Sequence, residues 1–463
     1  MLNPILAQEA LNLALSTGGD FAEIFLEDRR DNVLVLQDNR LETVNSGRIH
    51  GAGIRVYVGL NAVYTYTNDT DRDGLLRCAK KAAAAVRDQK EGFVKAKPFY
   101  TPEMEIVHTF RMLPSQTAAK QKADILRAAN AAARGYSNEI SQAVCTYKDS
   151  EQDVLICNSE GLFVTDRRVY TRLACTAVAS SGMENQSGNE NPGAMMGYEL
   201  FLDRVDPAYY GEKAAKTAVT MLHAPQCPSG VMPVAIDNGF GGVIFHEACG
   251  HSLEATSVAF GMSEFSGKLG QQIAASCVTA IDDGTMPNEW GSEHVDDEGT
   301  PTTKLVLIEN GVLKNYMIDR LNGKRMGMAP TGSARRQSYA FAPTSRMRNT
   351  YIAAGNDDNE EIISSMGDGL YAAKMGGGSV NPATGEFNFA VQEGYLVKDG
   401  KIDTPVRGAS LIGKGADVLM KIDRVGRDMQ MAQGMCGSMS GSVPTNVGEP
   451  MIRVSSMTVG GRA

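Results

Sequence analysis

The C-terminal half of the chain, from about residue 231, is rich in glycine and in β-hairpin signals and poor in long helical patterns. Asn310-Gly311 and Asp399-Gly400 each separate two apolar runs. A tight type I′ turn needs positive φ at both central residues, so Asn-Gly and Asp-Gly between apolar runs predict hairpins. We therefore expect this half to consist mainly of antiparallel strands.

The first 230 residues alternate between helical and strand patterns. Residues 4–16, 71–87, 115–136 and 207–222 each have a pattern that predicts a helix. β-branched and aromatic residues between these stretches predict strands. Residues 182–193, which are rich in Asn, Ser, Glu and Gly, predict a mobile loop.

Two breaks in this pattern divide the chain into three parts. The Lys-Ala-Lys-Pro stretch at 95–98 is typical of a linker, and a second boundary is marked by prolines and a glycine at 224–230. We therefore expect an α+β fold. It consists of two N-terminal α/β subdomains, residues 1–98 and 99–226, followed by a β-rich C-terminal domain, residues 227–463.

Charge and cysteine content narrow the class of protein. The formal net charge is −9 and no basic run is present, which argues against nucleic-acid binding as the main activity. Neither a secretory signal pattern nor an apolar stretch of transmembrane length appears, so no membrane partner is expected. The eight cysteines form no compact disulfide framework, which favours reduced thiols and a cytoplasmic location.

One segment of the C-terminal half contains residues suited to metal-assisted hydrolysis. His246 is followed directly by Glu247, and a second histidine, His251, comes five residues after the first. Imidazoles bind Zn²⁺, and an adjacent carboxylate can accept a proton from water. This segment would be the helical exception in a β-rich catalytic domain.

The spacing of the two histidines differs from the familiar His-Glu-x-x-His pattern. Residues i and i+4 lie roughly 40° apart around a helix, whereas i and i+5 lie roughly 140° apart. Either the pair is accidental, or the helix is broken or π-bulged just before His251, where Gly250 makes a break least costly. A catalytic zinc also needs a third protein ligand. The best candidate is Cys436, although a cysteine between glycines is often an inert small residue.

Several ordered blocks of the C-terminal half resemble the TldD/PmbA family of bacterial and archaeal metalloproteases, once called modulators of DNA gyrase. The N-terminal half is compatible with the same family at a weaker level. The blocks occupy residues 246–251, 296–301, 308–316, 334–339, 346–352, 376–389 and 435–444.

The resemblance implies specific roles for the motif residues. His246, His251 and Cys436 would be the zinc ligands, and Glu247 would be the general base that acts on water. The family also has a non-catalytic branch that lacks the His-Glu motif, so the motif places this chain on the TldD-like, catalytic side.

The resemblance further implies a zinc-dependent peptidase that cleaves unfolded or extended peptides through backbone strand pairing. It also implies a homodimer or a heterodimer with a PmbA/TldE-like paralogue. Two other functions stay open: a regulatory or structural partner subunit with a non-catalytic zinc site, and a zinc amidohydrolase of non-peptide substrates.

Other candidate site residues carry more than one interpretation. Arg336 and Arg346, with their neighbours Arg335 and Arg348, could bind a peptide carboxylate or stabilise an oxyanion, or could be solvated or interface charges. Gly377, in a run of three glycines, could admit a peptide backbone or simply form a turn. A further acid three residues after His251, Glu254, could orient that ring or be a surface carboxylate.

Overall fold

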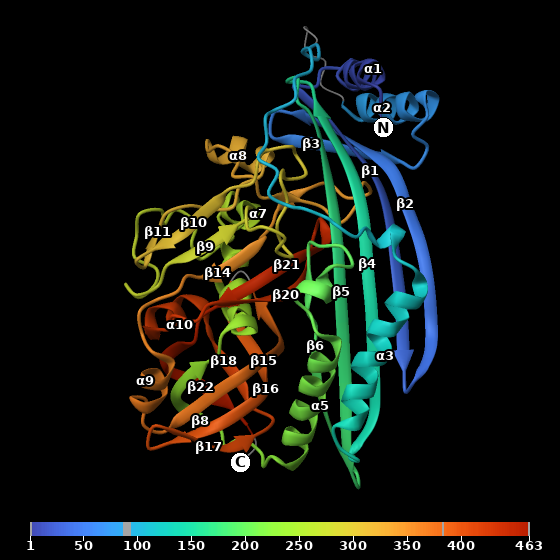
Figure 1. Cartoon of the computed structure of the whole chain (residues 1–463). Helices are drawn as coiled ribbons and strands as arrows, with labels where there is room; N and C mark the ends of the chain where they lie inside the picture. The colour runs from blue at the N-terminus through green and yellow to red at the C-terminus, as the bar shows by residue number, and fades with distance from the viewer. Residues whose placement is uncertain (1, 87–93, 382–383, 462–463) are drawn as a thin grey trace.

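A computed structural model describes residues 2–86, 94–381 and 384–461 of the chain. The N-terminal half forms one long, curved antiparallel sheet with the strand order β3-β2-β1-β4-β5-β6, and β7 pairs with β5 (Figure 1). The segments on the two sides of residues 95–98 share this sheet, because β1 pairs with β4. Its strands are β1 Phe21–Gln37, β2 Arg40–Val58, β3 Asn61–Thr67, β4 Ile140–Asn158, β5 Phe163–Ser181, β6 Glu184–Glu190 and β7 Gly193–Ala194.

The predicted loop over residues 182–193 is wrong. Most of this stretch forms β6, which pairs with β5 through a tight turn at Gly182, whose φ is +61°. The polar composition reflects an edge strand with exposed side chains, since β6 is the last strand on its side of the sheet.

Helices cover one face of this sheet, and the alternation of side chains explains which face they cover. Apolar residues at every second position of β1, β4 and β5 point to the helices and form two buried clusters with them. The four predicted N-terminal helices are confirmed, although Arg87 lies outside the described residues. They are α1 Pro4–Ala14, α2 Arg72–Ala85, α3 Ala119–Gly135 and α5 Pro207–His223, and a single turn, α4 Leu200–Asp203, precedes α5.

The C-terminal half builds two further sheets around the largest buried apolar cluster. One sheet has the order β11-β10-β9-β14-β21-β20, and the other has the order β15-β8-β22-β18-β16-β17 with β19 paired to β22. Their strands are β8 Gly230–Ile236, β9 Ala280–Asp283, β10 Lys304–Glu309, β11 Val312–Leu313, β14 Asn349–Ile352, β15 Gly369–Asn381, β16 Glu386–Lys398, β17 Lys401–Val406, β18 Ser410–Lys414, β19 Ile422–Val425, β20 Gln430–Ser438, β21 Gly441–Glu449 and β22 Ile452–Gly460.

Short elements connect these sheets. A two-residue pair, β12 Ala334–Arg335 and β13 Thr344–Ser345, lies apart from them. The helices of this half are all short: α6 Val243–Phe245, α7 Ala255–Val258, α8 Arg320–Met326, α9 Asn359–Ser364 and α10 Gly415–Lys421.

Both predicted hairpins are confirmed. Asn310-Gly311 joins β10 to β11, with φ of +49° and +82°, and Asp399-Gly400 joins β16 to β17, with φ of +49° and +72°. The expected α+β fold is confirmed as well, with a β-rich C-terminal half. All eight cysteines are free thiols in this structure. Within the described ranges, no helix is long and apolar enough to cross a membrane.

A buried ionic network joins the N-terminal sheet to the C-terminal half. Arg168 of β5 contacts Glu293 at 3.3 Å, and Glu293 also accepts from Arg348 at 2.6 Å and lies 3.5 Å from Arg335. Burial opposes ionisation of Glu293, but the three arginines outweigh it and lower the pKa of this carboxyl to about 2. The carboxylate therefore stays charged inside the protein.

We expect Glu293→Gln to lower the free energy of unfolding by about 3–5 kcal/mol at pH 7, because it leaves buried arginines without their anion. The folded-state pKa lies below the ordinary value near 4.5. The stabilisation is therefore complete above about pH 4.5 and is lost as the pH falls toward 2. Denaturant unfolding at pH 7 and pH 3 measures both effects, with the exposed Glu309→Gln as control. Equal stability of wild type and Glu293→Gln at pH 7 would contradict the network's role.

Candidate metal centre

The two motif histidines lie on a π-helical turn, His246–Gly250, that follows α6 and precedes a single 3₁₀ turn, His251–Leu253. The backbone N–H of His251 donates to the carbonyl of His246, which is the i+5 to i bond of a π turn. This bond brings residues five apart onto one side of the helix. The two imidazole rings consequently lie 5.1 Å apart between centroids, at 84° to each other.

Gly250 has a different role from the expected helix break. Its dihedral angles, φ −56° and ψ −51°, are ordinary helical values. A Cβ at this position would lie 2.2 Å from the sulfur of Met347. Any larger residue here would therefore push the buried side chain of Met347 aside, and the π turn supplies the change in spacing.

Cys436 reaches the histidines from a strand far along the chain. It lies on β20, paired with Val443 of β21. Its Sγ is 3.4 Å from Nε2 of His246 and 3.3 Å from Nε2 of His251. The three ligand atoms all lie within 4.8 Å of one another.

Electrostatics favour the thiolate form of Cys436. Burial alone would raise the pKa of the thiol, but His246 and His251 outweigh it and lower this pKa to about 3. Burial likewise opposes the charge on His251, while Glu254 and Cys436 raise the pKa of this imidazole well above its ordinary value. The cluster thus holds a negative sulfur next to imidazole nitrogens, and a thiolate is the form in which cysteine binds metals.

The donor set and its spacing fit a metal ion. Bond lengths of about 2.0–2.1 Å to nitrogen and 2.3 Å to sulfur in a tetrahedral site place neighbouring N and S ligands about 3.5 Å apart. The two observed N–S distances, 3.4 and 3.3 Å, agree with that separation. The cluster of His246, His251 and Cys436 can therefore hold a metal.

Glu254 is buried next to the cluster and is not a surface carboxylate. Its Oε2 lies 3.1 Å from Nδ1 of His251. A proton on Nδ1 donated to this carboxylate leaves the Nε2 lone pair of His251 directed at the cluster. The arrangement orients the ring as a metal ligand requires.

Glu247 lies on the accessible side of the cluster. Its side chain is 30% exposed, and Oε2 is 3.7 Å from Nε2 of His251. The carboxylate is close enough to act on a group bound at the cluster and open enough to exchange protons with water.

The arginine candidates lie inside the protein. Arg346 is fully buried and donates to the carbonyl of Cys436, to Ser440 Oγ at 2.9 Å and to the carbonyl of Gly441 at 2.8 Å. It therefore fixes the β20–β21 hairpin that carries the sulfur. The second candidate, Arg336, is also buried, and its guanidinium donates to Glu23 at 3.0 Å.

Arg335 and Arg348 are buried as well and belong to the network around Glu293. Gly377 lies on β15 and lines a cavity of about 490 Å³ between β6, β15 and β20. An added Cβ at Gly377 would meet nothing within 4 Å, so packing does not require glycine there.

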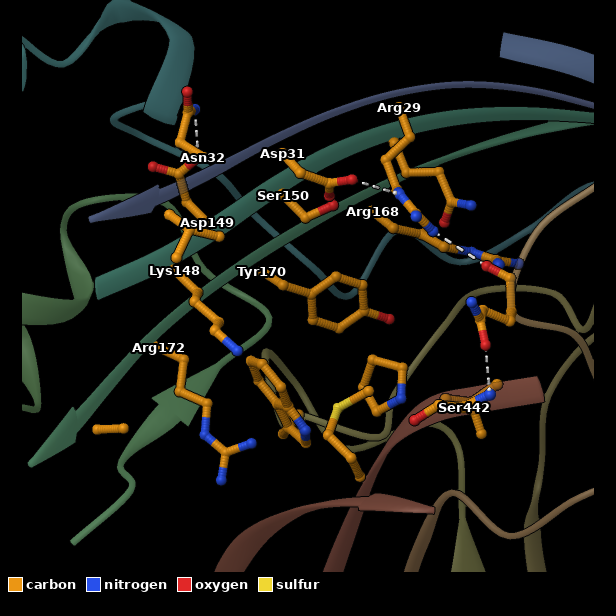
Figure 2. Close-up of a pocket in the computed structure, with 18 of the residues that line it drawn as sticks. Arg29, Asp31, Asn32, Lys148, Asp149, Ser150, Arg168, Tyr170, Arg172 and Ser442 are labelled. Carbon is orange, nitrogen blue, oxygen red and sulfur yellow. Dashed lines mark hydrogen bonds and ion pairs between the residues drawn. The ribbon is translucent and has the colours of Figure 1, made fainter. Parts of the chain in front are cut away.

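A larger cavity of about 600 Å³ lies between the N-terminal sheet and the β20–β21 hairpin. Figure 2 shows side chains of β1, β4 and β5 on one wall and Ser442 of β21 on the other. Met435, the residue before Cys436, also lines it. The site residues predicted from the sequence include none of the β1, β4 and β5 side chains on this wall. The alternation of polar with buried residues in β4, for example at Thr146, Lys148 and Ser150, is the sequence pattern that could have indicated them.

Comparison with known proteins gives a consistent result over nearly all of the chain. Three family models match: PmbA/TldA metallopeptidase domain 1 over residues 22–86, the central domain over 113–222 and the C-terminal domain over 229–461. A metalloprotease TldD homolog of Buchnera aphidicola is 32% identical over 450 residues, which cover 96% of this chain and 93% of that protein. A zinc metalloprotease TldD homolog of Saccharolobus solfataricus is 31% identical over 290 residues, 62% of this chain and 64% of that protein.

Two solved structures share the fold. A putative modulator of DNA gyrase from Thermotoga maritima has a TM-score of 0.81 at 23% identity and covers 98% of this chain and 99% of its own. TldE from Thermococcus kodakarensis has a TM-score of 0.78 at 18% identity, with 98% of this chain and 99% of its own covered.

Proposed function

Because this chain belongs to the PmbA/TldD family of metallopeptidases, we propose that it is a zinc-dependent peptidase acting on unfolded or extended peptides. The observation that carries the proposal is the convergence of His246, His251 and Cys436 beside the accessible carboxylate of Glu247. Digestion of a denatured polypeptide by the zinc-loaded chain, alone and together with a PmbA/TldE-like paralogue, followed by mass spectrometry, tests the proposal. A polypeptide that stays intact with both preparations after long incubation would contradict it.

In this proposal, His246, His251 and Cys436 would hold the ion. Bound zinc supplies Lewis-acid chemistry, which lowers the pKa of water and polarises a carbonyl. Glu247 accepts the proton of the attacking water and returns it to the leaving amine. Glu254 keeps the proton of His251 on Nδ1, and Arg346 holds the hairpin so that Sγ faces both rings.

The number of donors favours a catalytic site over a structural one. Structural zinc sites are closed by four protein ligands, whereas catalytic sites keep one position open. In the part of the chain that the structure describes, three donor residues meet at this cluster, and the side chain of Glu247 is partly exposed beside them. These features support a catalytic subunit over a partner subunit with a non-catalytic zinc site.

We also propose that the protein works as a dimer, with an identical chain or with a PmbA/TldE-like paralogue. The sheets of the C-terminal half end in strands such as β11 and β17, and a second chain would cover such edges. An obligate interface of this kind buries more than about 2,000 Å² in total. Sedimentation of the chain alone, and mixed with the paralogue, is expected to show a dimer at micromolar concentration. A monomer with full activity and no paralogue would contradict this proposal.

A further inference from the structure

One lysine and one arginine side chain lie side by side on one wall of the 600 Å³ cavity. Lys148 of β4 and Arg172 of β5 are directly paired in the antiparallel register. Both point away from the helix-covered face of the sheet and into the cavity, and Figure 2 shows them on adjacent strands. Like charges directly opposite each other destabilise a sheet, so this pairing has a cost in the free protein.

The other charged side chains around the cavity are neutralised. Arg29 pairs with Asp31, Asp149 pairs with Lys122, Arg336 pairs with Glu23, and Glu293 pairs with Arg168 and Arg335. Within the described ranges, Lys148 and Arg172 have no carboxylate at ion-pair distance. The net charge of the whole chain is −9, so an unneutralised pair of cations in a cavity is a local exception.

Arg172 is also held in a fixed position. Its guanidinium lies 5.3 Å from the ring centre of Trp290 and donates to the backbone carbonyl of Gln433 at 3.0 Å. Its Nε is buried and has no hydrogen-bond partner. Burial lowers the pKa of this side chain to about 10, so it stays positively charged at neutral pH. A fixed, partly exposed cation on the wall of a cavity is suited to bind an anion.

We propose that Lys148 and Arg172 together bind a carboxylate of the peptide substrate, either its C-terminal carboxylate or an Asp or Glu side chain. The inference rests on the proposed peptidase function. Gln433, which Arg172 contacts, precedes Cys436 on β20 by three residues, or about 10 Å of extended strand. The carboxylate would accordingly lie about three residues of extended peptide from the bond that is cut.

Binding can be measured without relying on cleavage. Trp290 is the only tryptophan of the chain and lies against Arg172, so its fluorescence reports on this site. The Glu247→Gln protein is titrated with variants of one extended peptide. One pair of peptides differs only in having a C-terminal acid or a C-terminal amide. The other pairs differ only in having Glu or Gln at one internal position. Calorimetry provides a parallel measurement.

A charge-assisted hydrogen bond is worth about 1.5–3 kcal/mol, so the preferred acid should bind at least about 10-fold more tightly than its neutral partner. Tighter binding of the C-terminal acid than of the amide identifies the C-terminal carboxylate as the ligand. Tighter binding of a Glu peptide than of its Gln partner identifies an acidic side chain. Arg172→Gln and Lys148→Gln, each made in the Glu247→Gln background, should remove the preference. The control is Arg167→Gln in the same background, because Arg167 lies on the same strand as Arg172 but does not line the cavity. It should retain the preference.

Thermal melting separates binding from a structural role. Lys148→Gln removes a like-charge contact and is expected to leave the melting temperature unchanged or raise it. The inference would be overturned if no acid peptide bound more tightly than its neutral partner. It would also be overturned if tighter binding of the acid persisted in both Arg172→Gln and Lys148→Gln. Cleavage without any carboxylate preference would overturn the inference and leave the peptidase function standing. Carboxylate-dependent binding without any cleavage by the wild type would support the site and contradict the peptidase function.

Discussion

Glu247→Gln is expected to reduce peptide hydrolysis by about 10²–10⁴-fold while leaving the metal content and the fold unchanged. Glutamine has nearly the same shape as glutamate but cannot accept a proton from water. The Glu247 carboxylate is outside the His246, His251 and Cys436 cluster that would hold the ion, so its replacement should not release metal. The measurement is kcat/KM on an unfolded peptide, together with metal content by mass spectrometry and a circular dichroism spectrum.

A matched control for this prediction is Glu212→Gln, which changes an exposed glutamate on α5 in the same way. It should hydrolyse the peptide as the wild type does. Near-normal turnover by purified Glu247→Gln, after a contaminating protease has been excluded, would assign the base to another residue.

Cys436→Ser should lose most of its bound metal and, with it, peptide hydrolysis. The Sγ atom lies within 3.4 Å of both Nε2 atoms and its pKa is held near 3, so the residue offers a thiolate. A serine hydroxyl stays protonated at neutral pH and is a much poorer zinc ligand. His246→Ala and His251→Ala are expected to lose metal for the same reason, since two donors do not complete a zinc site.

The control for this series is Cys277→Ser, because Cys277 is exposed and lies outside the cluster. This protein should keep its metal. Thermal melting of each variant shows whether metal loss reflects a changed ligand or an unfolded chain. Stoichiometric zinc in well-folded Cys436→Ser would remove Cys436 from the ligand set.

Local patterns predicted the helices and hairpins well, because caps and turn residues act within a few positions of the chain. Asp71 caps α2 through the N–H of Gly74, and Asn310-Gly311 adopts the positive φ that its turn requires. The long N-terminal sheet was beyond such patterns. Its central pairing joins β1 to β4, which are separated by about a hundred residues, and a strand's partner has no local signature.

The site residues also divide into those that the local sequence identifies and those that only distant pairing brings into place. The two histidines and Glu247 could be recognised from their spacing and chemistry. Cys436 lies 185 residues beyond His251, so the sequence could offer it only as a candidate third ligand, and the family resemblance implied its role. The arginines show what sequence could not provide. Arg336 is buried because its partner, Glu23, arrives from a strand 313 residues away. The Lys148–Arg172 pair likewise exists only through the register of β4 and β5.

Reconstitution with zinc tests the central claim most directly. The purified chain, with its paralogue if a heterodimer forms, is stripped with a chelator, dialysed and titrated with Zn²⁺ while hydrolysis of an unfolded peptide is followed. We expect the stripped protein to be inactive and activity to rise in proportion to bound zinc, with a plateau at one zinc per copy of this chain. Full hydrolysis by protein that mass spectrometry shows to be free of metal would contradict a metal-dependent peptidase.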